Sequence, residues 1–320
     1  MTANTPVVRT RVWRLLQGAA VVGALAFAVY AIRGQWSALR AAQSELRPSW
    51  GYVFAASLLT LCTYAALVHA WRMLTAVGGT RLRYPVAVRI WSIANLGRYL
   101  PGKVWSIVAL GVLARQAGVS PTTATTAAIA GTLINLGLGF AIVGGFGAAA
   151  LDAMRLTGGR WLAWAVAGLT VVGLGVAPAV LPRVIRWFAA RRGETALAAA
   201  PPPASTLWTV AAINAASWCA YGLAFRWLCL GIGVPGGDAG VMIAIFTASY
   251  LAGYLALPLP GGLVVRETAL VAALTGLGVM GSADATLAAV SSRLWLTVLE
   301  VLPGCVALAI GSREMRDRAA

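Results

Sequence analysis

The sequence predicts an all-α polytopic membrane protein, with about six transmembrane helices and two re-entrant hairpins made of broken helices. Hydrophobic residues make up 60% of the 320 residues and charged residues only 11%, which is far from the composition of a soluble domain. Several apolar runs reach the ~20 residues that cross a bilayer. Two further runs are interrupted by proline and glycine, which break a helix.

Six apolar runs are long enough to span the membrane, and together they predict a single integral membrane domain over residues 1-320. They are residues 15-32, 51-70, 122-149, 161-181, 207-229 and 285-311. The first run follows Arg9, Arg11 and Arg14 and resembles a signal peptide. We expect it to remain uncleaved, because the chain that follows consists mostly of further spans.

Two other stretches are each divided into pieces of close to 15 residues, too short to span alone. Pro101 and Gly102 separate residues 85-99 from residues 103-117. A segment with Pro260, Gly261 and Gly262 separates residues 239-256 from residues 263-277. Both stretches therefore predict re-entrant hairpins.

The hairpins stand at matching places in an internal duplication. Pro101 matches Pro260 at an offset of 159, and Gly118 matches Gly278 at an offset of 160. We place the first repeat at about 12-150, the second at about 160-312, and a proline-rich linker at about 191-206. Each half contains an odd number of crossings, so the second half is expected to be inverted, with one hairpin entering from each side.

The distribution of charged residues predicts the orientation of the chain in the membrane and argues against nucleic acid as a partner. The formal net charge is +16, and fifteen arginines fall in loops that are cytoplasmic if the N-terminus is inside, against five in outer loops. We therefore expect both termini in the cytoplasm and the protein in the bacterial inner membrane. Because the arginines flank apolar runs and form no basic patch, we expect membrane lipids as partners and no nucleic acid.

The sequence offers no set of residues for metal, cofactor or catalytic chemistry. Its four cysteines lie in apolar runs and its one histidine, His69, has no ligand partner nearby. The nine acidic residues are scattered. We expect no metal, no cofactor, no disulfide and no enzymatic activity, and the sequence contains no ATP-binding motif.

Ionisable residues at membrane depth are the candidates for function, since each costs ~2.5 to 3.5 kcal/mol to place there. Arg98 and Lys103 flank the first break, where free backbone N–H groups also favour a phosphate. Lys103 is the only lysine among twenty-five basic residues, which indicates a need for a compact ammonium. Arg266 follows the second break. These three residues are the predicted lipid or phosphate ligands.

Three further residues could form ion pairs or carry protons: Glu267, Arg293 and Glu300. Arg293 and Glu300 are seven residues apart, on one face of the last span. The alternative is a buried network of arginine and glutamate that fixes helix packing. Broken half-helices at matching positions of two halves also point to a binding site near the membrane midplane.

At these motifs the chain resembles the lysylphosphatidylglycerol synthase transmembrane region family, which is flippase-like and related to the membrane part of the multiple peptide resistance factor. Arg98-Tyr-Leu-Pro-Gly-Lys103 resembles the family's RYLPGK, and Pro260-Gly-Gly-Leu-Val-Val-Arg-Glu267 resembles its PGGLGVRE, with Val264 where glycine is usual. The resemblance implies translocation of aminoacylated phospholipid or of polyprenyl or glycolipid precursors.

Three functions stay open. The favoured one is a lipid translocase that handles an anionic head group. The second is a lipid-binding or assembly partner of a membrane-lipid or glycan enzyme, and the third, less favoured, is an intramembrane enzyme. The lipid, the energy source and the oligomeric state are not predicted.

Overall fold

The structure, a computed structural model, describes residues 48–99 without 78, residues 104–146, scattered positions between 161 and 183, residues 203–255 and residues 264–317. The predicted span at 15-32 and most of the linker at 191-206 lie outside the described residues, and thirteen scattered positions of the predicted span at 161-181 are described, all of them helical. Every regular element in the described ranges is a helix. The chain is therefore all-helical there, as its composition predicts.

The helices form two groups with the same order of long and short members. The first group is α3 (Trp50–Ala76), α4 (Tyr84–Asn95), the short 3-10 helix η1 (Leu96–Tyr99), α5 (Val104–Gln116) and α6 (Pro121–Phe146). The second group is α9 (Ala204–Gly231), α10 (Ala239–Leu255), α11 (Val265–Gly276) and α12 (Ser282–Asp317). This order is the one that the predicted duplication requires, while the repeat boundaries and the inversion stay predictions.

Within the described residues, three helices are long and apolar enough to cross a membrane. They cover Trp50–Ala76, Thr123–Phe146 and Ser282–Ala307, where the sequence predicts spans. The 28 residues of α9 would measure about 42 Å, but α9 is not among the three. It carries polar residues such as Asn214 and Ser217, which are buried inside the protein. The span at 207-229 therefore stays a prediction.

Polar residues start two of the helices that follow loops. Ser120 precedes Pro121, the first residue of α6, and its Oγ accepts a hydrogen bond from the N–H of Thr123 at 3.1 Å. Asp238 precedes α10, and its Oδ1 accepts a hydrogen bond from the N–H of Gly240 at 2.8 Å. Both arrangements satisfy backbone donors that the first helical turn leaves without partners.

The second helix of each hairpin ends at a glycine with the same geometry. Gly118 after α5 has a φ of 86°, and Gly278 after α11 has a φ of 66°. The N–H of Val119 donates to the carbonyl of Ala114 at 3.0 Å, and the N–H of Val279 donates to the carbonyl of Leu274 at 3.0 Å. Positive φ suits glycine, so these two residues, matched in the sequence, end equivalent helices in the same way.

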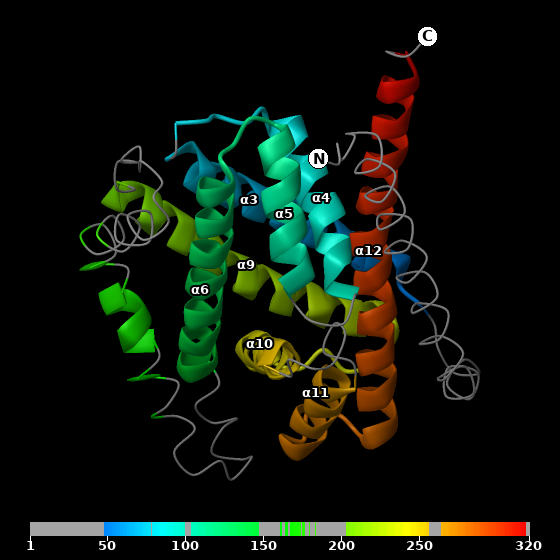
Figure 1. Ribbon diagram of the computed structural model, residues 1–320. Coiled ribbons are helices and arrows are strands. Elements are labelled where there is room, and N and C mark those ends of the chain that lie inside the picture. Colours follow the sequence, from blue (N-terminus) through cyan, green and yellow to red (C-terminus); the bar gives the residue numbers. More distant parts are fainter. Residues whose placement is uncertain are drawn as a thin grey trace.

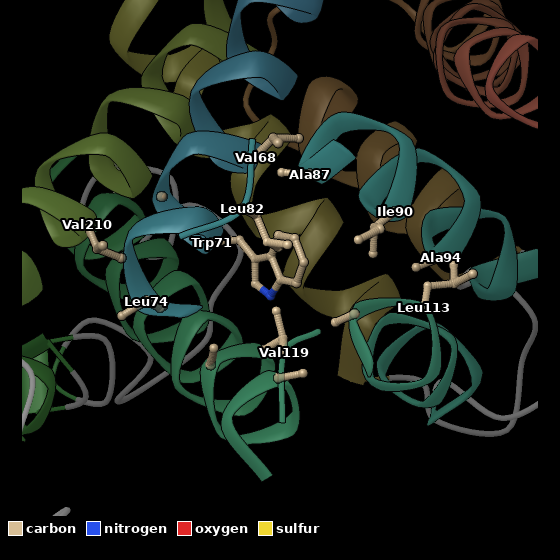
Figure 2. Packing of buried hydrophobic residues seen from close by; sticks show 14 of the residues in the cluster. Val68, Trp71, Leu74, Leu82, Ala87, Ile90, Ala94, Leu113, Val119 and Val210 are labelled. Atoms are coloured by element: carbon tan, nitrogen blue, oxygen red, sulfur yellow. The ribbon is translucent and has the colours of Figure 1, made fainter. Parts of the chain in front are cut away.

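Two apolar cores support the two groups of helices. The first packs α3, α4, α5 and α6 with the start of α9, and Trp71 of α3 lies within it beside Leu82 and Val119 (Figure 2). The second packs α9, α10, α11 and α12, and includes Phe225, Phe246 and Leu274. Each hairpin is thus held by its own core.

The hairpins lie toward opposite ends of the molecule. Figure 1 shows α4 and α5 in the upper half of the view and α10 and α11 in the lower half. Helices α3 and α9 pack against each other, and α12 contacts both α4 and α11. This placement is the one that hairpins entering from opposite faces require, although the sidedness of the chain stays a prediction.

Helix α12 continues through Pro303, and the residue after it makes a close contact with the first hairpin. A Cβ added to Gly304 would lie 3.0 Å from the side chain of Leu96 in η1. Proline inside a helix removes a backbone hydrogen bond and favours a kink. The proline therefore lies next to the point where α12 contacts η1.

Candidate functional site

A cavity of about 240 Å³ lies between the two groups of helices. Helices α3, α4, α5 and α6 of the first group line it, and so do α9, α10 and α12 of the second. Both halves of the predicted duplication therefore contribute to one internal space, which makes it the candidate site.

The first hairpin reaches the cavity from both sides of its break. Asn95, at the end of α4, and Ser106, in the first turn of α5, are both lining residues. Between them, a Cβ added to Gly97 would lie 2.9 Å from the backbone nitrogen of Ser106. Glycine is therefore required for η1 to pack this closely on the start of α5.

Aromatic side chains make up much of the wall. The rings of Tyr64 and Trp91 have centroids 5.7 Å apart, and those of Tyr64 and Tyr221 are 6.0 Å apart. On α9 and α10, Trp218 and Tyr250 meet edge to face at 5.5 Å. These separations are typical of attractive ring pairs. Tyr64 and Tyr221 stand in two similar segments, Cys62-Thr-Tyr64 and Cys219-Ala-Tyr221, at an offset of 157 that is close to that of the duplication. This similarity is the signal that could have identified them.

One carboxylate faces this aromatic surface. Glu300 of α12 is 9% exposed, and its Oε1 accepts a hydrogen bond from the hydroxyl of Tyr64 at 3.2 Å. Among the described lining residues it is the one side chain with a formal charge. The hydroxyl is a neutral donor, and the carboxylate also has a Coulombic interaction with the buried guanidinium of Arg266.

A layer of hydrogen-bonded polar side chains, formed by Asn135, Asn214 and Trp218, joins α6 and α9 at the same cavity. The side-chain nitrogen of Asn135 donates to Oδ1 of Asn214 at 2.9 Å, and Nε1 of Trp218 donates to the carbonyl of Asn135 at 2.9 Å. Asn214 in turn donates to the carbonyl of Val210 at 2.8 Å. Polar groups at membrane depth require such partners. Sequence analysis missed this layer because neutral polar residues do not stand out as charged ones do.

The α6 backbone approaches Trp218 closely at a second point. A Cβ added to Gly139 would lie 3.1 Å from the Trp218 ring and 3.2 Å from the side chain of Leu251. The missing side chain at Gly139 therefore allows Trp218 to lie against α6, where its indole nitrogen reaches Asn135.

Arg266, Glu267 and Arg293 form a cluster beside the cavity. Arg293 Nη1 lies 3.5 Å from Glu267 Oε1, and Arg266 Nη1 lies 3.9 Å from the same oxygen. Arg266 is 4% exposed and its Nη2 donates to Ser292 Oγ at 3.4 Å. Loss of Glu267 would leave two cations together in a buried place, which costs about 3–5 kcal/mol in comparable cases. Such a network can fix the packing of α11 on α12, and the choice between this role and lipid binding stays open.

Arg266 lies against two rings of the cavity wall. Its Cζ is 5.3 Å from the ring centroid of Phe246 and 5.8 Å from that of Tyr250, distances that allow cation–π attraction. It is not among the residues that line the cavity. A Cβ added to Gly253 would lie 2.8 Å from Arg266 Cβ, so α10 also packs closely against it.

The remaining predicted site residues are described in part or not at all. Arg98 lies in η1, three residues after the lining residue Asn95, but its side chain is outside the described residues, as are Pro101, Gly102 and Lys103. Pro260, Gly261 and Gly262 at the second break are also outside them. Their assignment to a lipid or phosphate site stays a prediction.

A comparison with curated proteins finds no match to the chain. A family model does match it, over residues 14–304, which include both predicted hairpins and every residue that lines the cavity. The match and the apolar helices together indicate a multi-pass membrane protein with a lipid-related function. The chain belongs to the family described as the lysylphosphatidylglycerol synthase TM region.

Proposed function

We propose that the protein is a lipid translocase of the bacterial inner membrane, with both termini in the cytoplasm and no catalytic activity of its own. The observation that carries this proposal is the cavity of about 240 Å³ between the two groups of helices. A site near the middle of a duplicated membrane protein can open to either face when one half rocks against the other. The acyl chains of the lipid would stay in the bilayer while the head group crosses through this space.

The cations of the hairpins are proposed to handle the phosphate of an anionic head group. Arg98 and Lys103 flank the first break, and the lining residues Asn95 and Ser106 bracket the same segment. Arg266 is assigned the same role from the second half. Because it lies under Phe246 and Tyr250, these rings would have to move before it meets a phosphate.

A transport assay on Lys103 tests this proposal. The protein would be reconstituted in liposomes with phosphatidylglycerol that carries a fluorophore on an acyl chain, and exchange between leaflets would be followed by adding a membrane-impermeant quencher. Lys103→Ala is expected to slow exchange about tenfold, in line with loss of a charge-assisted hydrogen bond. Lys103→Arg should be almost as slow, because the site is proposed to need a compact ammonium.

Arg115→Ala is the matched control, since Arg115 is an exposed cation in the last turn of α5, the helix that begins directly after Lys103. It should exchange lipid at the wild-type rate. Wild-type protein that binds lipid but does not accelerate exchange would overturn the proposal and favour a lipid-binding or assembly partner of a membrane enzyme.

A further inference from the structure

Helix α12 contributes to both apolar cores of the protein. Ala285, Ala288 and Leu296 lie in the second core, with α9, α10 and α11. Ala307, farther along the same helix, lies in the first core, with α4 and α5. Pro303 stands between these two parts. The change from one core to the other therefore falls beside the one residue of α12 that has no backbone N–H to donate.

Polar contacts hold the part of α12 before Pro303 to α3 and α11. Nη1 of Arg293 lies 3.5 Å from Oε1 of Glu267 on α11. Nε1 of Trp295 donates a hydrogen bond to Oγ of Ser57 on α3 at 2.9 Å. Hydrogen bonds and ion pairs depend strongly on distance and angle, so this part of α12 keeps a fixed position on its neighbours.

The part of α12 after Pro303 meets the first hairpin through small residues. A Cβ added to Gly304 would lie 3.0 Å from the side chain of Leu96 in η1, and Ala307 packs in the first core. Figure 1 shows this part of α12 in the upper half of the view, as are α4 and α5. Apolar contacts have no directional requirement, so this part can follow the first hairpin without breaking a polar contact.

The corresponding helix of the first half has no interior proline. At the offset of 160 between the two halves, Pro303 matches Val143 of α6 (303 − 160 = 143). The one proline of α6 is Pro121, its first residue. An interior proline leaves the carbonyl four residues earlier, here that of Leu299, without its helical N–H donor, and helices bend at such positions. The duplication therefore does not require Pro303.

We propose that α12 is a hinge for lipid translocation and flexes at Pro303. The first hairpin moves with the part of α12 after the proline, while the part before it stays with α11. This inference rests on the proposed function and deepens it, because rocking of the halves needs a few residues that absorb the change in backbone angles. Helix α9 also contributes to both cores but contains no proline, so α9 serves as the axis and α12 as the hinge.

Pro303→Ala tests the hinge, because it supplies a backbone donor for the carbonyl of Leu299 and stiffens the helix. The variant should have a higher midpoint of thermal unfolding and should bind phosphatidylglycerol as the wild type does, with native mass spectrometry as the readout. Its exchange of that lipid in liposomes should be about tenfold slower, which corresponds to a barrier raised by about 1.4 kcal/mol. A more stable variant with wild-type exchange would overturn the hinge.

Pro121→Ala is the matched control, since Pro121 is the first residue of α6, where a backbone N–H has no helical acceptor. This variant should exchange lipid at the wild-type rate. Equal slowing in both variants would show that transport responds to the loss of any proline and not to stiffening of α12, and would also overturn the hinge.

Distances between the two hairpins test the motion in the wild-type sequence as well. Spin labels would be attached through Gln116→Cys on α5 and Ala272→Cys on α11, two exposed positions, after replacement of the native cysteines. In nanodiscs with phosphatidylglycerol, protein that retains Pro303 is expected to show two separations, and Pro303→Ala only one of them. A single separation with Pro303 present, or the same two in Pro303→Ala, would contradict the inference.

Failure of this inference and failure of the proposed function give different results. Protein that binds lipid and shows both separations, but does not accelerate exchange, would keep the hinge as a motion of the fold and remove the translocase. Wild-type exchange by Pro303→Ala, with both separations retained, would keep the translocase and remove the hinge.

Discussion

Val264 adopts a backbone conformation that its side chain disfavours. Its φ is 69° and its ψ is −49°, and among the described residues it is the one non-glycine position with positive φ. A β-branched side chain in this region stores roughly 1–3 kcal/mol of strain. We predict that Val264→Gly raises the midpoint of thermal unfolding, since glycine adopts positive φ without that cost.

Val271→Gly is the control for this prediction, because Val271 lies inside α11 with helical geometry, and glycine there should lower stability by about 0.5–1 kcal/mol or more. Unfolding followed by circular dichroism in detergent would compare the two variants. A lower midpoint in both would show that residue 264 carries no strain.

The sequence could locate the charged residues of the site but not their partners. Arg266, Glu267, Arg293 and Glu300 stand out because charge at membrane depth is costly. Which of them meet depends on how α11 packs on α12, and the structure pairs Glu267 with Arg293 while Glu300 contacts Tyr64. Such contacts between distant segments have no signature in a single sequence.

Contact between α9 and α10 depends on a glycine. A Cβ added to Gly222 would lie 2.4 Å from Cα of Ile243, and a backbone atom cannot move aside as a flexible side chain can. We predict that Gly222→Ala separates the two helices and lowers thermal stability by about 1–3 kcal/mol or more, as overpacking does in other cores. Thermal unfolding in detergent and the yield of monodisperse protein would measure it.

Gly51→Ala provides the contrast, because a Cβ at Gly51 would meet nothing within 4 Å. In the first turn of α3 alanine is the better helix former, so this variant should equal or exceed the wild type in stability. Wild-type stability of Gly222→Ala would mean that α10 is not packed against α9 as closely as the structure shows.

Proline and glycine made the helices of the hairpins predictable within a few residues. The first stretch was predicted as residues 85-99 and 103-117, and it forms α4 and α5, which end and begin beside the same break. The short helix η1 was not predicted. It depends on the contact of Gly97 with Ser106, and close approach between backbones is not visible in hydrophobic periodicity.

The arrangement of the two hairpins makes a prediction about access from the two sides of the membrane. The four native cysteines would first be replaced, since Cys62 is exposed and would itself react. A cysteine introduced at Gly102 should then react with an impermeant maleimide from the cytoplasmic side, and one at Gly261 from the outer side. This difference follows if each hairpin enters the membrane from a different face.

Inverted and right-side-out vesicles supply the two directions of access, and a cysteine introduced at Arg115, in a predicted cytoplasmic segment, serves as the reference for the inner side. Reaction of both hairpins from one side would rule out an inverted repeat. The order of long and short helices could be predicted because an internal duplication fixes it, while the inversion stays a prediction. The sequence could not predict the cavity, whose wall is assembled from seven helices.

The two halves are not chemically equivalent where they meet. Gly118 and Gly278 end equivalent helices directly before α6 and α12, at an offset of 160, so the position in the first half that this offset matches with Glu300 is Phe140 (300 − 160 = 140). An aromatic ring that packs against Val143, Trp218 and Leu251 thus stands where the other half carries an acid. A carrier whose halves differ in this way would release its lipid at different rates toward the two leaflets. Unequal release changes the lipid concentration at which transport in each direction saturates. Without an energy source it does not change the final distribution of the lipid between the two leaflets, which depends on the chemical potential of the lipid alone.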